Sequence, residues 1–318
     1  MFDVISVGSA TEDVFVYIPQ KFATHDACVF HPGTKVDIKE MDYFTGGGAT
    51  NTAVAFSRLG FRTSVLCVVG NDESGNSVIK NLKDEKVNTS FVKKIPGKTP
   101  YSVILTGFGR DRIVLCYSNM TASINKAKTN FSKLKAKWFY ISSLHSKPVL
   151  LKKIVAHAKS TGTRIAFNPG NEELSLGFEG LKKAVKKVEI LLLNKEEALK
   201  LTGSGDIHRN LKKLSEIATI VVITDGNAGA HATNGVYAYS VGIFDVPRVD
   251  VTGAGDAFGS GFTAAIMKGK SIEEALLYGG ANASSVIQSL GTKNILLTEK
   301  ALQKFLKTHK LAVKKQKL

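Results

Sequence analysis

The chain has 318 residues, of which 43% are hydrophobic and 22% charged, a balance typical of folded globular proteins and not of disordered or collagen-like chains. No apolar run approaches the roughly 20 residues that span a bilayer, so we expect no membrane partner. The formal net charge is +16, and most of the excess is lysine scattered along the sequence. Proteins that bind nucleic acids more often cluster arginine and aromatic residues on one face, so we expect no specific nucleic-acid partner. A basic surface would instead favour anionic substrates such as nucleotides.

Residue types with special chemistry are sparse outside the glycine motifs. The cysteines are odd in number and lie in apolar surroundings, which predicts reduced core thiols and a cytoplasmic location: Cys28, Cys67 and Cys116. The histidines show no metal-ligand spacing. Lysines gather only near the end, which we interpret as a solvated tail: Lys310, Lys314, Lys315 and Lys317.

The first part of the chain alternates strands and helices. Residues 3–8 are a short apolar run that predicts a buried strand, and residues 9–13 follow its carboxyl end, where open α/β sheets bind ligands. After a glycine-rich turn at residues 45–51, we expect a helix at 52–59, a strand at 61–69 and a helix at 73–86. This order is typical of a parallel sheet.

Two stretches interrupt this order and predict a second, small sheet. Residues 99–107 and 113–117 are strand-like runs joined through residues 108–112, as in a hairpin. Residues 14–44 begin with a β-branched run at 14–18 and are then too irregular for the main sheet. We expect these segments to form one small sheet that covers the main one as a lid.

The alternation of strands and helices then resumes to the end. Strands are expected at 138–142, 164–168, 190–193 and 220–224, with helices near 148–160, 178–187, 195–201 and 206–217. Residues 231–241 predict a hairpin that turns at Asn234-Gly235. The pattern S-x-x-E from Ser271 predicts a capped helix to about residue 290, and residues 298–308 predict a last helix. The whole chain is therefore expected to be a single doubly wound α/β domain over residues 1–318, with lid segments at about 14–44 and 99–117.

Residues 250–258, with sequence DVTGAGDAF, form the motif around which we expect the site to be built. Gly253 and Gly255 allow a tight turn and a close approach to a ligand, and a Cβ at either position is expected to obstruct that approach. The helix that follows offers free backbone N–H groups to an anion. Asp256 in its first turn has two interpretations, a helix-capping group or a proton acceptor beside a phosphate.

Residues 202–206, with sequence TGSGD, have nearly the same letters in a different context. They follow a helical run, so Gly203 is interpreted as an ordinary helix stop. The segment after them, 207–217, carries charged residues as a solvent-facing helix does. We therefore interpret this second copy as structural.

With both glycine motifs placed, the chain resembles the ribokinase-like (PfkB) carbohydrate kinases over nearly its full length. Residues 46–53, with sequence GGGATNTA, match the N-terminal signature of that family, and residues 250–261 match its C-terminal signature. The two signatures lie in the family order, about 200 residues apart. Asn194 and Glu197 supply the N-x-x-E element of the family.

The resemblance implies transfer of the γ-phosphoryl group of ATP, with Mg²⁺, to a hydroxyl of a small molecule. It makes Asp256 the base and the amides of Gly253, Ala254, Gly255 and Asp256 the anion hole. The remaining implied positions fall into three groups. Acceptor hydroxyls would be bound by Asp13, Thr11, Gly46, Gly47 and Asn51; the nucleotide by Asn194, Thr224, Gly226, Gly229 and Asn282; and Mg²⁺, through water, by Glu197.

Several of these assignments have alternatives. Asn194 and Glu197 are also explained as a strand-end amide and a surface glutamate, and Asn282 as a satisfied core amide. Some members of the family bind a monovalent cation near the position of Asp250, but here Ile295 replaces one oxygen ligand. We also expect a homodimer formed through the lid, because an exposed edge of the small sheet would be a liability unless a partner covered it.

For the acceptor, we favour a sugar over a nucleoside, because Thr11, Asp13 and Asn51 offer short hydrogen-bonding groups. Thr11 stands where ribokinase has an asparagine, which leaves the identity of the sugar open. A nucleoside would require an aromatic residue from the lid, for which Tyr101 and Tyr117 are candidates. A non-enzymatic alternative is a kinase-like sensor or a basic nucleic-acid-binding protein.

Overall fold

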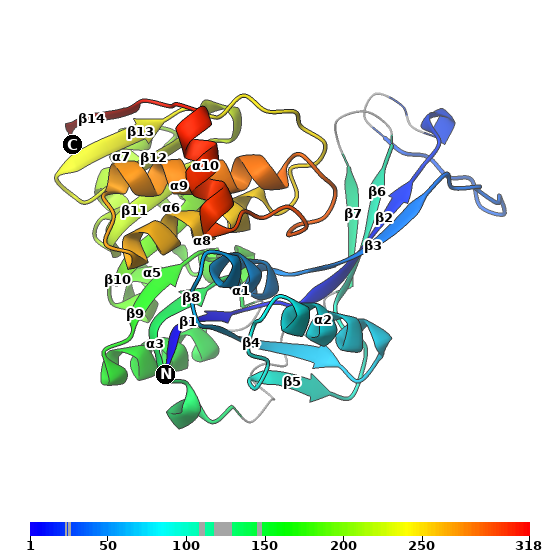
Figure 1. The fold of residues 1–318 in the computed structure, drawn as a ribbon, viewed down its shortest axis with the longest axis horizontal. Helices are drawn as coiled ribbons and strands as arrows, with labels where there is room; N and C mark the ends of the chain where they lie inside the picture. The colour runs from blue at the N-terminus through cyan, green and yellow to red at the C-terminus, as the bar shows by residue number, and fades with distance from the viewer. Residues whose placement is uncertain (23, 25–26, 108–111, 118–128, 145–147) are drawn as a thin grey trace.

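The computed structural model describes residues 1–318 apart from positions 23, 25–26, 108–111, 118–128 and 145–147. Among the described residues, ten strands form one large sheet (Figure 1). Their spatial order is β14 (Val313–Lys317), β13 (Tyr237–Val241), β12 (Ala230–Thr233), β11 (Ala218–Thr224), β10 (Val188–Asn194), β9 (Arg164–Phe167), β8 (Ala136–Ile141), β1 (Phe2–Val7), β4 (Thr63–Gly70) and β5 (Val92–Ile95). Pairing is parallel from β11 to β5 and antiparallel from β11 to β14. The predicted doubly wound, mainly parallel sheet is confirmed.

Helices cover both faces of this sheet because its central strands are apolar on both sides. In β10, Ile190 and Leu192 pack into one core cluster, whereas Leu191 and Leu193 pack into the other, as strand alternation requires. The face of Leu191 is covered by α3 (Val149–Thr161), α5 (Gly177–Val185), α6 (Lys195–Thr202) and α7 (Ile207–Leu214), with the short α4 (Asn171–Leu174) beside them. The face of Ile190 is covered by α1 (Gly48–Arg58), α8 (Ala254–Met267), α9 (Ile272–Val286) and α10 (Glu299–Thr308). A third cluster joins α1 and β4 to α2 (Glu73–Asp84).

Four strands form a separate small sheet, as predicted, which stands to one side of the main body in Figure 1. Their order is β3 (Met41–Gly46), β2 (Thr11–Tyr17), β6 (Tyr101–Thr106) and β7 (Ile113–Tyr117). The predicted β6–β7 hairpin is present, and most of its connection lies outside the described residues. Residues 11–13 follow the carboxyl end of β1 as expected, and they begin β2, because they pair with β3 and β6.

The register of the small sheet divides its side chains between two faces, since paired residues lie on the same side. Asp13 is opposite Phe44 and Ser102, and this side is called the Asp13 face. Val14 is opposite Tyr43 and Val103, and this side is called the Val14 face.

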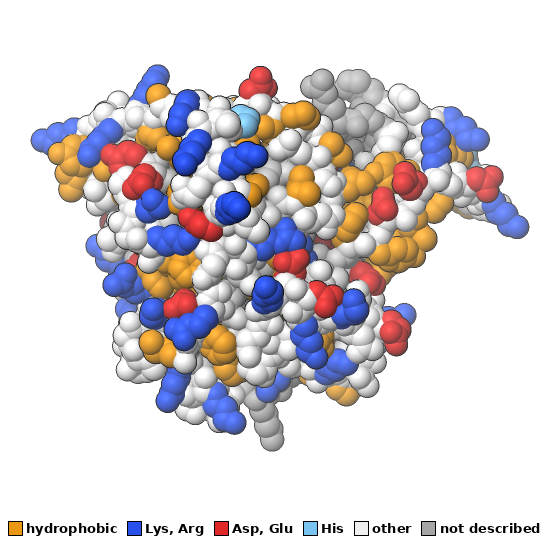
Figure 2. Space-filling model, in the orientation of Figure 1, with side chains coloured by type: hydrophobic (Ala, Val, Ile, Leu, Met, Phe, Trp, Pro, Cys, Tyr) orange, Lys and Arg blue, Asp and Glu red, His pale blue; other side chains and the backbone are white. Residues whose placement is uncertain are grey.

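The C-terminal lysines are not a solvated tail. Lys314, Lys315 and Lys317 lie in β14, which pairs with β13 of the large sheet, whereas Lys310 lies just before this strand. Lys315 places its ammonium 4.5 Å from the ring centre of Tyr237. Lysine side chains on an edge strand discourage pairing with further chains. Figure 2 shows the other lysines and arginines dispersed among acidic and neutral side chains on the visible face.

Other differences from the sequence predictions are small. The strand β5 was missed, and α9 ends at Val286, earlier than predicted. All three cysteines are free, but only Cys67 is a buried core thiol, because Cys28 is half-buried and Cys116 is exposed. No helix among the described residues has the length and apolar character needed to cross a membrane.

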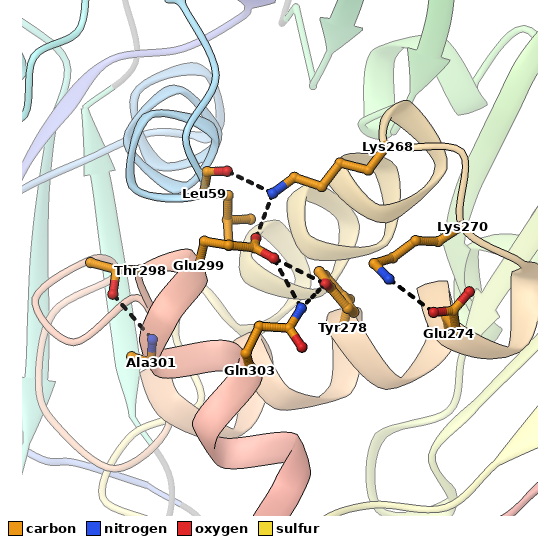
Figure 3. A network of polar contacts seen from close by, with 9 residues as sticks. All are labelled: Leu59, Lys268, Lys270, Glu274, Tyr278, Thr298, Glu299, Ala301 and Gln303. Carbon is orange, nitrogen blue, oxygen red and sulfur yellow. Dashed lines mark hydrogen bonds and ion pairs between the residues drawn. The ribbon is translucent and has the colours of Figure 1, made fainter.

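A polar network holds together the helices on one face of the sheet (Figure 3). At the end of α8, Lys268 Nζ donates to Leu59 O at 3.0 Å and to Glu299 Oε2 at 2.6 Å. Glu299 also accepts from Tyr278 Oη of α9 at 3.0 Å. The network lies about 18 Å along α8 from its first turn, by the rise of 1.5 Å per residue.

Candidate active site

The turn before α8 brings the backbone to a helix N-terminus as the sequence predicted. Gly253 caps the helix at φ 83°, and a Cβ there would lie 2.9 Å from Thr292 Cα, so this position requires glycine. The N–H of Ala254 donates to Val251 O at 3.2 Å and is used by the turn. Gly255 and Asp256 follow in the first turn, where backbone N–H groups have no partner within the helix. Of the four predicted anion-hole amides, these two are therefore the best placed.

Gly255 differs from its predicted role. Its φ is not positive, and nothing lies within 4 Å of a Cβ built there, so the expected obstruction does not come from the protein. The residue instead borders two adjoining clefts at the α8 N-terminus. A side chain at Gly255 would enter space that a ligand can occupy.

Asp256 is held by Asn51 and is not a helix cap. Asn51 Nδ2 donates to Asp256 Oδ2 at 2.8 Å, and Asp256 makes no capping hydrogen bond in α8. Burial raises the pKa of the Asp256 carboxyl, while the Asn51 hydrogen bond and the nearby Lys293 ammonium act in the opposite direction. A carboxylate with one oxygen hydrogen-bonded and a raised pKa has the properties of a general base.

The predicted acceptor residues lie together where β2 and β3 of the small sheet meet α1. Thr11 Oγ1 donates to Asp13 Oδ1 at 3.0 Å, and burial raises the pKa of the Asp13 carboxyl. A Cβ at Gly46 would lie 1.8 Å from Asp13 Oδ2, so glycine is required there for the carboxylate to fit. Gly47 turns the chain into α1 at φ 96°, and Asn51 is in the first turn of that helix. The predicted acceptor group is thus a contiguous set of polar groups that contacts Asp256 through Asn51.

Three of the predicted nucleotide-binding residues, Thr224, Gly226 and Gly229, border a cleft of about 200 Å³ beside the α8 N-terminus. Its walls are mainly apolar and include Thr224, Gly226, Gly229, Phe244, Ala254, Phe258, Ala283 and Ser284. Gly229 has φ 94°, and a Cβ there would lie 2.0 Å from Val241 O. A cleft with mainly apolar walls and a few polar groups is suited to an aromatic heterocycle.

A second cleft, of about 270 Å³, continues from the first toward Asp256. It shares Thr224, Gly255 and Phe258 with the first and is bordered further by Asn168, Asn194, Glu197 and Asp256. The arrangement provides one path from the apolar cleft to the carboxylate of Asp256. A phosphate chain lying along this path would meet the first turn of α8.

Asn194 and Glu197 have a structural role in addition to facing this second cleft. Glu197 N donates to Asn194 Oδ1 and Asn194 N donates to Glu197 Oε2, each at 2.8 Å, which is a capping box at the start of α6. Burial raises the pKa of the Glu197 carboxyl. The side chains are therefore fixed in orientation beside the cleft.

Asn282 does not face the nucleotide cleft. Its side chain is fully buried, donates from Nδ2 to Ala257 O at 2.9 Å and accepts from Leu297 N at 3.2 Å. The predicted contact with adenine is corrected to a core amide, since both ends of the amide are used inside the protein. Its neighbours Ala283 and Ser284 border the cleft instead.

Asp250 lies beside the α8 turn and has one oxygen free for a cation. Its Oδ1 accepts from Thr252 N at 3.1 Å and from Thr252 Oγ1 at 2.9 Å. Nη1 of Arg112, the residue before β7, lies 3.9 Å from the same oxygen. Within the described part of the chain, the buried Oδ2 has no hydrogen-bond partner. Ile295, in the other loop that would supply ligands, offers no side-chain oxygen.

Sequence reasoning missed the residues that surround Asn51. Thr292 Oγ1 donates to Asn51 Oδ1 at 2.7 Å, and Lys293 Nζ lies 3.3 Å from the same oxygen. Asn168, at the border of the second cleft, was also missed. No local pattern marks a lysine or threonine of this kind in a chain so rich in lysine, whereas Asn168 follows a predicted strand and was accessible to the strand-end argument.

The candidate tyrosines for stacking on a base are on the wrong face. Tyr101 and Tyr117 pair with each other and with Glu12, which places them on the Val14 face. On the Asp13 face, the aromatic rings are Phe15 and Phe44, packed edge to face at 5.5 Å.

The fold is that of an α/β protein in which two adjoining clefts meet at the N-terminus of α8. The family model for the pfkB family carbohydrate kinases matches residues 1–299. A nucleoside kinase of Methanothermobacter thermautotrophicus is 28% identical over 311 residues, covering 95% of each chain. A nucleoside kinase of Methanocaldococcus jannaschii superposes with a TM-score of 0.82 at 23% identity, over 96% of this chain and 99% of the other. The ribokinase of Arabidopsis thaliana, solved with ribose and ATP, superposes with a TM-score of 0.78 at 20% identity, over 96% and 99%.

The chain belongs to the pfkB family of carbohydrate kinases. It is accordingly a phosphotransferase with an alcohol group as acceptor.

Proposed function

We propose that the protein transfers the γ-phosphoryl group of ATP to a hydroxyl of a sugar, with Asp256 as the base. The observation that carries this proposal is the hydrogen bond of 2.8 Å between Asn51 and Asp256. It joins the polar group around Asp13 to the first turn of α8. A hydroxyl held by Asp13 and Asn51 would therefore lie next to both the base and the phosphate path.

The reaction then follows from the positions of the groups. Asn51 occupies Oδ2 of Asp256, which leaves Oδ1 to accept the proton of the acceptor hydroxyl. The hydroxyl oxygen forms a bond to the γ-phosphorus as the bond from that phosphorus to the β,γ-bridging oxygen breaks, and ADP leaves. The amides of Gly255 and Asp256 stabilise the charge on the transferring phosphoryl, as fixed N–H dipoles do. In this scheme the apolar cleft holds adenine, near Thr224, Gly226 and Gly229.

The residues present fit a Mg²⁺ ion held through water, and they fit a monovalent cation only in part. We propose that Glu197, together with Asn194, binds the waters of a Mg²⁺ ion, which would neutralise phosphate charge. Within the described residues no cluster of three carboxylate, histidine or cysteine side chains could hold a metal directly, so binding through water suits this site. The free Oδ2 of Asp250 supports a monovalent cation beside the α8 turn, with Ile295 counting against a complete ligand set.

We propose that the small sheet is a lid within a single kinase domain of residues 1–318 and also a dimer contact. The Val14 face carries apolar side chains that are largely exposed: Met41, Tyr43, Leu115 and Tyr117. Figure 2 shows hydrophobic side chains gathered on this part of the molecule. Such an exposed apolar surface on a sheet favours burial against a second copy. We also propose a cytoplasmic location, because the three cysteines are free and thiols stay reduced in that compartment.

A nucleoside is the second candidate acceptor. Two of the relatives named above are nucleoside kinases. The Asp13 face also carries Phe44, Ile104 and Val114, an apolar strip on which a base could pack. Phe15 is buried and packs edge to face against Phe44, so these two rings do not offer a pair of faces between which a base could stack. A sugar is therefore favoured.

The test is ADP release from ATP and Mg²⁺ across pentoses, hexoses, sugar phosphates and nucleosides, with the Asp256→Asn protein as the blank for each acceptor. We expect the highest kcat/KM for a sugar. A nucleoside that exceeds the best sugar by about tenfold would reverse the choice of acceptor. If no acceptor gives turnover above the blank, the kinase assignment of this site fails in favour of the sensor alternative.

A further inference from the structure

Lys293 is a buried lysine beside the proposed base. Its side chain is only 4% exposed, and Nζ donates to Thr50 Oγ1 at 3.0 Å and to Asn51 Oδ1 at 3.3 Å. Among the described residues, no ion pair within 4.0 Å includes Lys293, so its ammonium is bonded to neutral oxygens. Burying an ammonium without a contacting carboxylate is unfavourable, which suggests that the position serves the site.

The hydrogen bonds around Asn51 fix which way its amide points. Oδ1 accepts from Thr292 Oγ1 at 2.7 Å and from Lys293 Nζ at 3.3 Å, and of these two groups the ammonium can only donate. With its oxygen held on that side, the amide presents Nδ2 to Asp256 at 2.8 Å. Lys293 therefore helps to select the amide orientation that stabilises the Asp256 carboxylate.

The loop that carries Lys293 is itself held in place. Arg58 at the end of α1 donates from Nη1 to Asn294 O at 3.1 Å and to Leu296 O at 2.9 Å. Arg58 also forms two hydrogen bonds with Glu85, the closest one at 2.5 Å, so the charge of Glu85 is already balanced.

The charged and titratable groups that act on Lys293 come from several elements. They are Asp13 of β2, Asp256 of α8, Glu85 after α2 and Cys67 of β4. Because Arg58 balances Glu85 and the Cys67 thiol is neutral, the two site carboxylates are the charges that remain for Lys293 to balance.

We propose that Lys293 is a positioning residue for Asp256, which it keeps charged and correctly oriented through its own charge and through Asn51. The inference rests on the proposed role of Asp256 as the base. Asp13 is buried and Asp256 is half-buried, and the mutual repulsion of the two carboxylates and their partial loss of solvent both favour the protonated form. An ammonium on the opposite side of Asn51 offsets this effect, so that Asp256 can accept a proton at neutral pH.

The expected pH dependence distinguishes this role from a structural one. Without the ammonium, the pKa of Asp256 rises, so the acid limb of the kcat/KM profile moves to higher pH. Burial lowers the pKa of Lys293 to about 8, so above that pH the parent has also lost the charge. The loss of kcat/KM on removing Lys293 is therefore greatest at acidic pH and disappears at basic pH. A merely structural defect would lower kcat/KM by about the same factor at every pH.

The experiment compares Lys293→Met, Lys293→Arg and Lys268→Met with the parent, using the acceptor found in the ADP-release assay. Lys268 serves as the control because its Nζ also donates two hydrogen bonds inside the protein, to Leu59 O and Glu299 Oε2, but at the far end of α8 from Asp256 (Figure 3). For Lys293→Met we expect a loss of about tenfold or more near pH 6 that narrows to within about threefold near pH 9. Lys293→Arg keeps the acid limb of the parent, and Lys268→Met moves neither limb. If Lys293→Met does not fold, Lys293→Gln replaces it. A loss that is uniform across pH would overturn the proposal.

A second measurement does not depend on turnover. In carbon-labelled protein, the carboxyl signal that disappears in Asp256→Asn is assigned to Asp256 and titrated by NMR. We expect this signal to titrate at higher pH in Lys293→Met than in the parent. An unchanged titration rejects the role of Lys293 even in an active enzyme, while a shifted titration in a protein without kinase activity supports it and rejects only the proposed function.

Discussion

Asn51 Nδ2 donates to Asp256 Oδ2 at 2.8 Å, although the two residues are 205 positions apart in the chain. The bond joins the first turn of α1 to the first turn of α8, so the two glycine motifs form one site. Both helices pack on the same face of the large sheet. The position of the base relative to the acceptor group is therefore set by the packing of α1 against α8.

Asp256→Asn should abolish turnover while the protein still folds and binds ATP. The carboxamide keeps the shape but accepts no proton, and a positioned base contributes about 10²–10⁴ to the rate. The measurement is kcat at saturating substrates, together with ATP binding by calorimetry. Asp206→Asn is the matched control, since Asp206 follows a similar glycine turn, caps α7 and can be replaced there by asparagine. More than about half the parent activity in Asp256→Asn would exclude it as the base.

Gly255→Val should fold normally and lose phosphoryl transfer. Nothing in the protein lies within 4 Å of a Cβ at Gly255, so the added side chain meets only what binds in the clefts. Gly205 also has open space around its Cβ position and lies in the similar turn before α7. We expect equal melting temperatures for Gly255→Val and Gly205→Val, with the activity lost only in the first. Equal activity in the two variants would mean that the phosphates lie elsewhere.

Asp13→Asn should weaken binding of the acceptor and leave binding of ATP unaffected. A hydrogen bond to a charged group contributes about 1.5–3 kcal/mol, so we expect KM for the acceptor to rise by roughly 10- to 100-fold. KM for ATP is measured in the same assay and should stay within about twofold. Asp37→Asn, at an exposed position of the chain before β3, serves as the control. A change confined to KM for ATP would place Asp13 outside the acceptor site.

Leu115→Glu should convert a dimer into a monomer. Leu115 is 55% exposed on the Val14 face, and a carboxylate there cannot be buried against a second apolar sheet. Leu199→Glu is the control, because Leu199 is 46% exposed on α6, far from the small sheet in the fold. The mass in solution is measured by light scattering for the parent and both variants. A monomeric parent at high concentration would remove the dimer from the proposal.

The sequence predicted those parts of the site that depend on local backbone. Gly253 and Gly47 must turn the chain at positive φ before a helix, and that requirement is visible in the letters GAGD and GGGATN. The same reasoning separated Gly203, a left-handed helix stop, from the site glycines. The small sheet was predicted because its strands break the alternation of strand and helix.

The parts that were missed depend on contacts between distant segments. An asparagine on an apolar helix can hydrogen-bond either to a ligand or to groups inside the core. Only the hydrogen bonds of Asn282 with Ala257 and Leu297 show that it belongs to the core. Lys293 could not be chosen among the lysines, since its burial depends on α1 and the loop after α9 packing together. The strand β14 is rich in lysine and was missed because pairing with β13, not strand propensity, gives it its structure.

The last prediction concerns how the buried Lys293 lowers the free energy of unfolding. Burial lowers the pKa of Lys293 from 10.5 to about 8, so between these values the unfolded chain holds a proton that the folded protein has released. The free energy of unfolding of the parent should therefore rise with pH across this window, by up to about 3 kcal/mol relative to Lys293→Met, in which the group is absent. Urea unfolding at about pH 7.5 and about pH 10 gives the free energy of unfolding of the parent and of Lys293→Met. Subtracting the variant from the parent at each pH removes the contribution of the other lysines, which the two proteins share. If the free energy of unfolding of the parent does not rise relative to that of Lys293→Met between these pH values, the pKa of Lys293 is not lowered in the folded protein. A difference that grows as expected would identify a stability cost carried beside Asp256, which is what a residue retained for the chemistry of the site should show.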